Sequence, residues 1–373
     1  MPSSLVTAKT ISLVLRPLTP IHVWSGRRLL MGLDIVGRGA DMLCIVDLDK
    51  LPSNIVNELA NARADDIPKI LERRSAQLPC KLVLRAIATV LPYAQVLEMN
   101  QYIVPGSTLK GYIRTAILFH MLRGISDKAK LVEVLESGID LTKESKYVSE
   151  GLEAQFFRVP RPRKQGGFVD SFQSLLVLDP ELRVEPNCLS VSELQVVELV
   201  GGKLKPIASQ FAVVATCGEL RYRVSIRAST PGILSRVVSQ VPEHKADVEK
   251  LRLLDGVDIV KVLKEFGCSI LLREIERLSI YKELEAYLSL LKDLYSKYCT
   301  RESRCVIARL GYMTGHIAKT VLSIVKDAYP QLYQQIRSYM ESKLHHTWDE
   351  LTIKLVRSPQ GLVGPGWCEV CIE

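Results

Sequence analysis

Two cations, Lys110 and Arg114, stand four residues apart directly after the turn Pro105-Gly106. If a helix begins at this turn, both side chains lie near its first two turns, beside free backbone N–H groups and the positive end of the helix dipole. Such a place favours a phosphate group, so the expected chemistry is anion binding. The GxxxxGK[ST] spacing of a P-loop is absent from the sequence, and a plain strand–helix connection with exposed cations is the structural alternative.

The helix that must position these cations has signals at both of its ends. Ser107 or Thr108 can cap its start, and Gly124 can end it. Lys110 and Arg114 fall outside the expected apolar face. That face is formed by residues at helical spacing, namely Leu109, Ile113, Ala116 and His120.

Two further stretches are rich in cations. One is a run of four cations in seven residues without an acid, which reads Arg158-Val-Pro-Arg161-Pro-Arg163-Lys164. Its two prolines exclude a helix interior, so we expect an extended arm. In the other stretch, cationic and apolar residues alternate along a predicted strand, which gives the strand one cationic face and one apolar face. The cationic face would hold Arg221, Arg223, Ser225 and Arg227, and the apolar face Tyr222, Val224 and Ile226.

Either stretch alone could be a solvated surface, but together they favour a polyanion such as nucleic acid. The chain has 373 residues, and 49 Lys and Arg against 41 Asp and Glu give a net charge of +8. Hydrophobic residues at 47% and charged residues at 24% are typical of a globular protein. No run approaches 18 apolar residues, and the N-terminus lacks a hydrophobic signal segment, so we expect a soluble cytoplasmic protein without membrane contact.

The nine cysteines are scattered along the chain. They lie in apolar strings, as is typical of small buried residues in a reducing cell, and a chain of this length needs no disulfide to hold a core. Cys368-x-x-Cys371 has the spacing of zinc ligands, but no second pair stands at a suitable distance. We expect ordinary core or edge cysteines, no metal and no cofactor.

The pattern along the chain mixes strands and helices, which predicts an α+β fold. Strands are expected within residues 10–47, 81–91 and 153–227, and helices within 53–77, 125–150 and 243–300. The last helical stretch is heavily charged and indicates an inserted layer. After residue 304 comes a second glycine loop, RLGYMTGHIAKT, with Gly311, Gly315 and Lys319, running into an apolar helix. Two units of strand, glycine loop and helix suggest a diverged duplication.

Several segments, in this order, resemble the RAMP (repeat-associated mysterious protein) superfamily of CRISPR–Cas systems. They are LRPLTPIHVWSG, YIVPGSTLKGYIRTAIL, FVDSFQSLLV, CGELRYRVSI, RLGYMTGHIAKT and GPGWCEV. Within the superfamily, the chain is most similar to the fifth Csm subunit of type III-A effector complexes over nearly its whole length. Several subunits share the PGSTLKGYIRTA block. One position departs from the pattern, because Trp24 stands where relatives usually have a small residue or glycine.

The resemblance implies an RRM-like (ferredoxin-like) RAMP domain plus a degenerate second RAMP-like domain, with helical insertions. We place the N-terminal RAMP/RRM-like domain with its insertions at residues 1–230 and a helical region at 231–303. Residues 304–373 would be the glycine-loop and helix part of the second RAMP-like unit.

The resemblance also implies a non-catalytic RNA-binding subunit of a CRISPR ribonucleoprotein in antiviral defence. It would cap the 3′-end side of the guide RNA and contribute to guide maturation and assembly. Expected partners are the CRISPR guide RNA, the backbone RAMP subunit, the small helical subunit and target RNA. Expected RNA contacts are His22, Ser25, Gly26, Gly106, Ser107, Lys110, Gly111, Arg114, Gly311, Gly315 and Lys319. The cation-rich stretches add Arg158, Arg161, Arg163, Lys164, Arg221 and Arg223.

The main alternative is a RAMP-type metal-independent endoribonuclease that processes precursor guide RNA. Its chemistry needs a base at the attacking 2′-OH, an acid at the leaving oxygen and a stabilising cation. His22 is the natural base, with Lys110 or Arg114 as the cation. A single loop histidine more often hydrogen-bonds or stacks, so we expect no catalytic residue, and we expect structural roles for Asp34 and Asp170. The other alternative is a different RAMP subunit of a type III complex.

Overall fold

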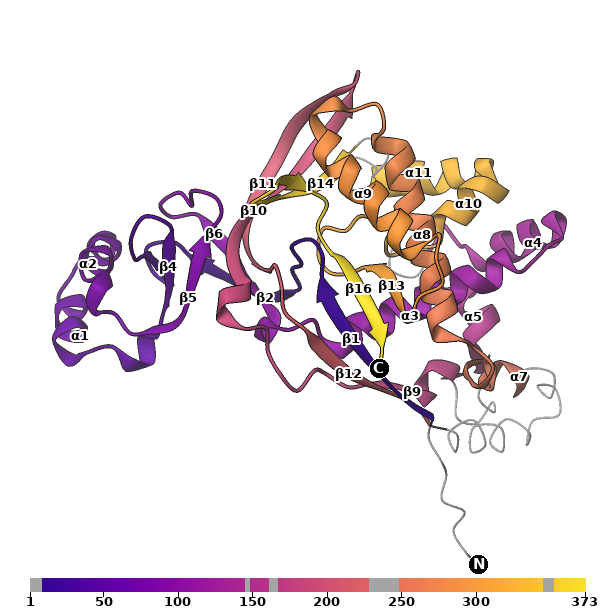
Figure 1. Ribbon diagram of the computed structural model, residues 1–373, viewed down its shortest axis with the longest axis horizontal. Helices are drawn as coiled ribbons and strands as arrows, with labels where there is room; N and C mark the ends of the chain where they lie inside the picture. Colours follow the sequence, from indigo (N-terminus) through magenta and orange to yellow (C-terminus); the bar gives the residue numbers. More distant parts are fainter. Residues whose placement is uncertain (1–8, 145–147, 161–166, 228–247, 345–351) are drawn as a thin grey trace, which may run out of the picture.

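The computed structural model describes residues 9–144, 148–160, 167–227, 248–344 and 352–373. Strands and helices are mixed around two large β-sheets, so the predicted α+β class is confirmed (Figure 1). Three of the expected RNA contacts, Arg161, Arg163 and Lys164, lie outside the described residues. Among the helices of the described ranges, none is both long and apolar enough to cross a membrane.

The first sheet has five strands in the order β13-β16-β1-β12-β9, and all neighbours are antiparallel. β1 lies beside β16, from the other end of the chain, with Leu13 opposite Ile372. Residues 304–373 therefore complete a sheet that the N-terminal residues begin, and the domain boundaries drawn from the sequence stay a prediction. The strands are β1 (Lys9–Pro17), β9 (Leu175–Val177), β12 (Leu220–Ile226), β13 (Cys305–Arg309) and β16 (Trp367–Ile372).

The second sheet has nine strands, of which seven follow the order β2-β6-β11-β10-β5-β4-β3, while β14 pairs with β10 and with β15. Its longest feature is the hairpin β10 (Leu189–Val200) and β11 (Lys203–Ala215), which rises to the top of Figure 1. A short separate ribbon joins β7 (Arg158–Pro160) and β8 (Phe168–Asp170). The remaining strands are β2 (Trp24–Leu30), β3 (Ile35–Gly37), β4 (Met42–Val46), β5 (Cys80–Ala86), β6 (Gln95–Met99), β14 (Thr352–Ser358) and β15 (Gly361–Val363).

Two long helices, α3 (Gly106–Arg123) and α8 (Ile259–Leu278), pack on each other beside the first sheet. Phe266 of α8 contacts Tyr112 and Phe119 of α3, with ring centroids 5.2 Å apart in each pair. α8 and α9 confirm the helical layer predicted within residues 243–300. The other α-helices are α4 (Lys128–Gly138), α5 (Glu150–Phe157), α7 (Val248–Leu251), α9 (Glu285–Tyr298), α10 (Leu322–Ala328) and α11 (Pro330–Leu344).

A small unit built from β3, β4 and β5 projects on the left of Figure 1, where it carries α1 (Ser53–Ala60) and α2 (Ile67–Arg73). The helical stretch expected over 53–77 is therefore broken into two short helices. The unit has its own apolar core, formed by Val36, Cys44, Val46, Ile55, Leu71 and Leu78.

The pairing of the cysteines differs from the expectation. All nine lie in described residues, and eight of them form four disulfides, which leaves Cys368 as a buried free thiol. The prediction of ordinary unpaired cysteines was wrong because each bridge joins residues 29 to 66 positions apart, which local spacing does not reveal. The bridges are Cys44–Cys80, Cys188–Cys217, Cys268–Cys299 and Cys305–Cys371.

Removing one bridge should lower thermal stability. In the loop-entropy account, a bridge over a loop of this length stabilises the fold by about 3–4 kcal/mol because it restricts the unfolded chain. We expect the double Cys268→Ser, Cys299→Ser variant to melt roughly 4–5 °C below the oxidised parent, as measured by calorimetry. Thiol titration of the oxidised parent in denaturant should find one free thiol per chain. Nine reactive thiols, with no effect of reductant on the parent's Tm, would contradict the pairing.

Candidate nucleic-acid interface

The first turn of α3 is closed by the protein's own groups. α3 begins at Gly106, without the predicted side-chain cap from Ser107 or Thr108. The backbone N–H of Gly106 donates to Oδ1 of Asp179 at 2.6 Å, and a Cβ at Gly106 would lie 2.5 Å from the carbonyl oxygen of Val177. Glycine thus lets the helix end lie against the end of β9, and a carboxylate occupies the place expected for a phosphate. Asp179 therefore closes this helix end in the structure, and phosphate binding here stays a prediction.

The two cations of α3 do not converge on one point. Nζ of Lys110 donates to the carbonyl oxygen of Leu175 at 2.7 Å. Arg114 donates to Oε2 of Glu153 at 2.7 Å and to both carboxylate oxygens of Asp170 at 2.9 Å. Both heads are therefore engaged within the fold, which corrects the expected shared phosphate contact.

Arg114 also lies between two aromatic rings. Its guanidinium carbon is 4.6 Å from the ring centroid of Phe157 and 4.8 Å from that of Phe172. A planar guanidinium can stack on rings and bind a carboxylate bidentately at once, so this arginine joins α3 to α5 and to the segment after β8. Its position is that of a structural residue.

Arg158, the first cation of the expected arm, belongs to the same cluster. It donates to Oε1 of Glu150 at 2.8 Å and to Oδ2 of Asp170 at 3.4 Å. Burial opposes ionisation of Asp170, but its hydrogen bonds and the nearby charges of Arg114 and Arg158 outweigh it and hold the pKa of this carboxyl below its usual value. Asp170 also accepts from the N–H of Phe172, which agrees with the turn expected there. Arg158 is consequently part of the fold and not of a free arm.

His22 is buried, with 1% of its surface exposed. Its Nδ1 donates to the carbonyl oxygen of Val213 at 2.7 Å, while Nε2 has no partner among the described residues. Burial lowers the pKa of this imidazole to about 4, although the hydrogen bond to Val213 raises it. The ring is therefore neutral at pH 7 and enclosed, so the expected direct contact of this side chain with RNA is corrected.

The loop after β1 is joined to the second glycine loop through backbone groups. The N–H of Tyr312 donates to the carbonyl oxygen of His22 at 2.7 Å. Gly311 has φ +100°, and a Cβ there would lie 2.5 Å from the same carbonyl oxygen, so both its conformation and its close contact require glycine. The N–H of Gly366 donates to the carbonyl oxygen of Pro20 at 3.0 Å and ties in the C-terminal segment. α10 begins at Leu322, directly after the loop.

The start of β2, the end of β13 with the second glycine loop, and one face of α3 line a cleft of about 470 Å³. Of the predicted contacts, Gly111, Gly311 and Lys319 line it. Sequence reasoning missed other lining residues, among them Trp24, Thr108, Thr115 and Tyr312. The signal was present in part, because Thr108, Gly111 and Thr115 are small residues at positions i, i+3 and i+7 of one helix face. The cleft brings together the two glycine units that the sequence showed separately.

Four other predicted contacts lie close to these segments in the chain. Ser25 and Gly26 belong to β2, which begins at Trp24, and not to a free loop. Oγ of Ser25 donates to Oε2 of Glu98 at 3.4 Å, and Gly26 is exposed with open space where a Cβ would be. Gly315 is half-buried in the turn before Lys319. Ser107 is exposed on α3 but lines a different groove, together with Lys110.

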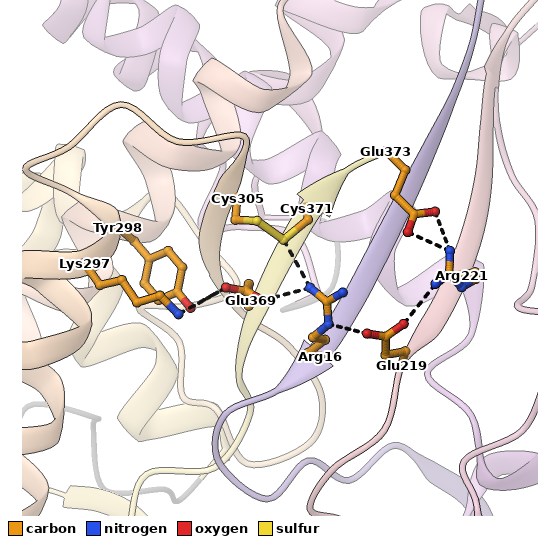
Figure 2. A network of polar contacts seen from close by, with 9 residues as sticks. All are labelled: Arg16, Glu219, Arg221, Lys297, Tyr298, Cys305, Glu369, Cys371 and Glu373. Atoms are coloured by element: carbon orange, nitrogen blue, oxygen red, sulfur yellow. Dashed lines mark hydrogen bonds and ion pairs between the residues drawn. A yellow bond between two sulfur atoms is a disulfide. The ribbon is translucent and has the colours of Figure 1, made fainter.

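The alternation predicted for β12 is confirmed, with buried Tyr222, Val224 and Ile226 and exposed Arg221 and Arg223. Arg221 is neutralised by acids, as Figure 2 shows. It donates to Oε1 of Glu373 at 2.6 Å and to Oε2 of Glu219 at 3.0 Å. Arg223 forms no ion pair with a described residue, so it is the stronger candidate of the two for contact with a polyanion.

Figure 2 also shows the surroundings of the Cys305–Cys371 disulfide. Cys305, Glu369 and Cys371 have ligand atoms within 4.8 Å of one another, but the two sulfurs are bonded together. Arg16 and Lys297 donate to Glu369, at 3.0 and 3.3 Å, and bring positive charge to the same place. This group therefore does not support a metal centre.

No protein-family model matches the chain, and no curated protein matches it. Solved structures do match it, and two of them are described next. One is a chain of the cryo-EM structure of a Csm–crRNA–target RNA ternary complex in a type III-A CRISPR–Cas system. The match has a TM-score of 0.66 and 18% sequence identity, and it covers 98% of this chain and 100% of that chain. The other is the crystal structure of T. onnurineus Csm5, with a TM-score of 0.56 and 17% identity, covering 95% of this chain and 99% of that one.

The chain therefore has the fold of these two structures. This is a Csm5-like fold over nearly the full length of the chain, which confirms the resemblance stated from the sequence at the level of the fold.

Replacing Arg114 should destabilise the protein. Arg114→Ala takes the nearest cation from the half-buried Glu153 and Asp170, leaves them only the more distant Arg158, and removes a stacked side chain, so we expect a loss of about 2–4 kcal/mol in the free energy of unfolding. Lys110→Ala is the matched control on the same helix, with an expected loss of about 1 kcal/mol for one hydrogen bond. Urea unfolding measures both. Equal small losses would contradict a structural role for Arg114.

Acid should destabilise the fold through His22. Its folded pKa of about 4 lies below the ordinary 6.5, so between these values the unfolded chain binds the proton more readily. The stability due to neutral His22 is full above pH 6.5 and falls as the pH drops toward 4, by up to about 3 kcal/mol. In His22→Asn, which keeps a donor for Val213, the loss between pH 7 and 4 should be smaller by this amount. Identical pH profiles from chemical unfolding would show that His22 is not the titrating group.

Proposed function

We propose that the chain is a non-catalytic RNA-binding subunit of a type III CRISPR ribonucleoprotein effector complex, which caps the 3′-end side of the guide RNA. The observation that carries the proposal is the cleft in which α3, the start of β2 and the second glycine loop meet. Gly111 has open space where a Cβ would be and so leaves room for a nucleic-acid backbone to approach, and Lys319 lines the same cleft. Support comes from the fold, which matches a chain of a complex that holds crRNA and target RNA.

We further assign an RRM-like core to the first sheet. The order β16-β1-β12-β9, with α3 between β1 and β9 in the sequence and α8 between β12 and β16, corresponds to the 4-1-3-2 order of a ferredoxin-like βαββαβ unit. β13 is then an added edge strand. The second RAMP-like unit would be the segment from β13 to β16, which supplies the second glycine loop.

The contacts that the cleft offers are suited to positioning RNA and not to reading its sequence. Backbone groups, threonine hydroxyls and a lysine recognise phosphate and ribose, which every nucleotide shares. Exposed Arg223 on β12 adds a cation outside the cleft. Expected partners are the guide RNA, the backbone RAMP subunit, the small helical subunit and target RNA.

The endoribonuclease alternative is weakened by His22. A general base must reach the 2′-OH of the substrate within hydrogen-bond distance. The ring of His22 is 1% exposed and its Nδ1 is engaged by Val213, so the residue proposed as the base is not available. Lys110 and Arg114, the proposed cations, are engaged by other groups of the fold.

A carboxylate placed in the cleft should repel RNA. Gly111 is exposed with open space around a Cβ, so Gly111→Glu fits sterically, and the charge should lower affinity for single-stranded RNA by more than about tenfold at low salt. Gly256→Glu is the matched control, because Gly256 is also exposed with open space around a Cβ but lies outside the cleft. Fluorescence anisotropy measures both, and the RNA should stay uncleaved with and without Mg²⁺. Equal binding by both variants, or cleavage of guide precursor, would contradict the proposal.

A further inference from the structure

Trp24 is exposed at the mouth of the cleft without being needed to fill the core. Its surface is 39% exposed although tryptophan is usually largely buried. The indole N–H donates to the carbonyl oxygen of Arg27 at 3.0 Å, so the polar edge of the ring is satisfied by its own strand. The remaining apolar ring surface is thus held in a fixed orientation and lines the cleft.

The neighbours of Trp24 form a rigid aromatic and cationic setting. The ring of Tyr312 lies 6.3 Å away at an interplanar angle of 48°, and the guanidinium carbon of Arg28 lies 5.9 Å from the indole centroid. Tyr312 is itself held in place from behind by His22, whose ring contacts it edge-on at 5.8 Å. Nε2 of Gln210 donates to its hydroxyl at 3.3 Å. Neither aromatic side chain is free to turn away from the cleft.

We infer that Trp24, supported by Tyr312, is a stacking platform for one unpaired base of the bound RNA; this rests on the proposed function. Flat apolar rings beside a cation favour a nucleobase over an aliphatic side chain, because stacking and cation–π contacts both use the faces of a base. Every base has such a face, so the platform holds RNA without selecting its sequence. Thr108, Gly111 and Lys319 line the other walls of the cleft, beside the place where ribose and phosphate would lie.

Truncation of Trp24 separates stacking from charge. Trp24→Ala should lower the affinity for a fluorescein-labelled oligouridine by about 5- to 100-fold, while Trp24→Phe should keep most of it. The slope of log Kd against log salt should not change, because stacking releases no counterions. An oligonucleotide of the same length made of abasic units should bind the parent and Trp24→Ala equally. Tyr93→Ala, which removes another exposed aromatic side chain outside the cleft, is the control.

A second readout does not depend on truncation. In a Trp348→Phe background, which leaves Trp24 and Trp367 as the two tryptophans, oligouridine should quench the emission, and adding Trp24→Phe should abolish the quenching because Trp367 is fully buried. If the parent binds no RNA, the proposed function fails and the platform with it. If the parent binds RNA and Trp24→Ala binds it equally well, the platform alone is overturned. Loss of Trp24→Ala from the assembled complex with unchanged RNA affinity would overturn it too and indicate a protein contact.

Discussion

The position of the cleft depends on backbone hydrogen bonds between three segments that are far apart in the sequence. The N–H groups of Leu18 and Thr19, which follow β1, donate to the carbonyl oxygen of Trp367 at 2.8 and 3.1 Å. The N–H of Leu310, after β13, donates to the carbonyl oxygen of Gly366 at 2.8 Å. Since backbone groups make these bonds, the side chains that line the cleft can change without moving its walls. The antiparallel pairing of β1 with β16 brings the segments into reach.

Much of the positive charge that suggested a nucleic-acid partner is neutralised inside the fold. Arg114 and Arg158 form ion pairs with one cluster of carboxylates, and Arg221 forms ion pairs with another. Arg309 forms a buried ion pair with Glu274. A net charge of +8 therefore does not translate into a dense cationic surface, and RNA binding in the proposed cleft would depend on shape and stacking as much as on charge.

Local periodicity explains what the sequence could predict. The alternation along β12, the end of α3 at Gly124 and the helical layer of α8 and α9 follow from neighbours in the chain, and all are present. The candidate site could not be predicted as well from the sequence, because its side chains contact residues that are far away in the chain. Asp179 stands 73 residues from Gly106, and Val213 stands 191 residues from His22. The prediction of unpaired cysteines was wrong for the same reason, because each disulfide joins residues that are far apart in the sequence. Trp24 stands out in the sequence, but its position beside Tyr312 depends on a tertiary contact that the sequence does not show.

The two glycine units meet in one cleft and do not form two equivalent sites. Lys319 of the second unit lines it, whereas Lys110 of the first lies in the other groove, so their similar sequence positions do not give them similar roles. An RNA segment in the cleft would contact residues from both ends of the chain at once. Binding to such a folded arrangement stabilises it relative to the unfolded chain, by an amount that grows with RNA concentration. Guide binding in the cleft would therefore stabilise the packing of the start of β2 and the second glycine loop against α3.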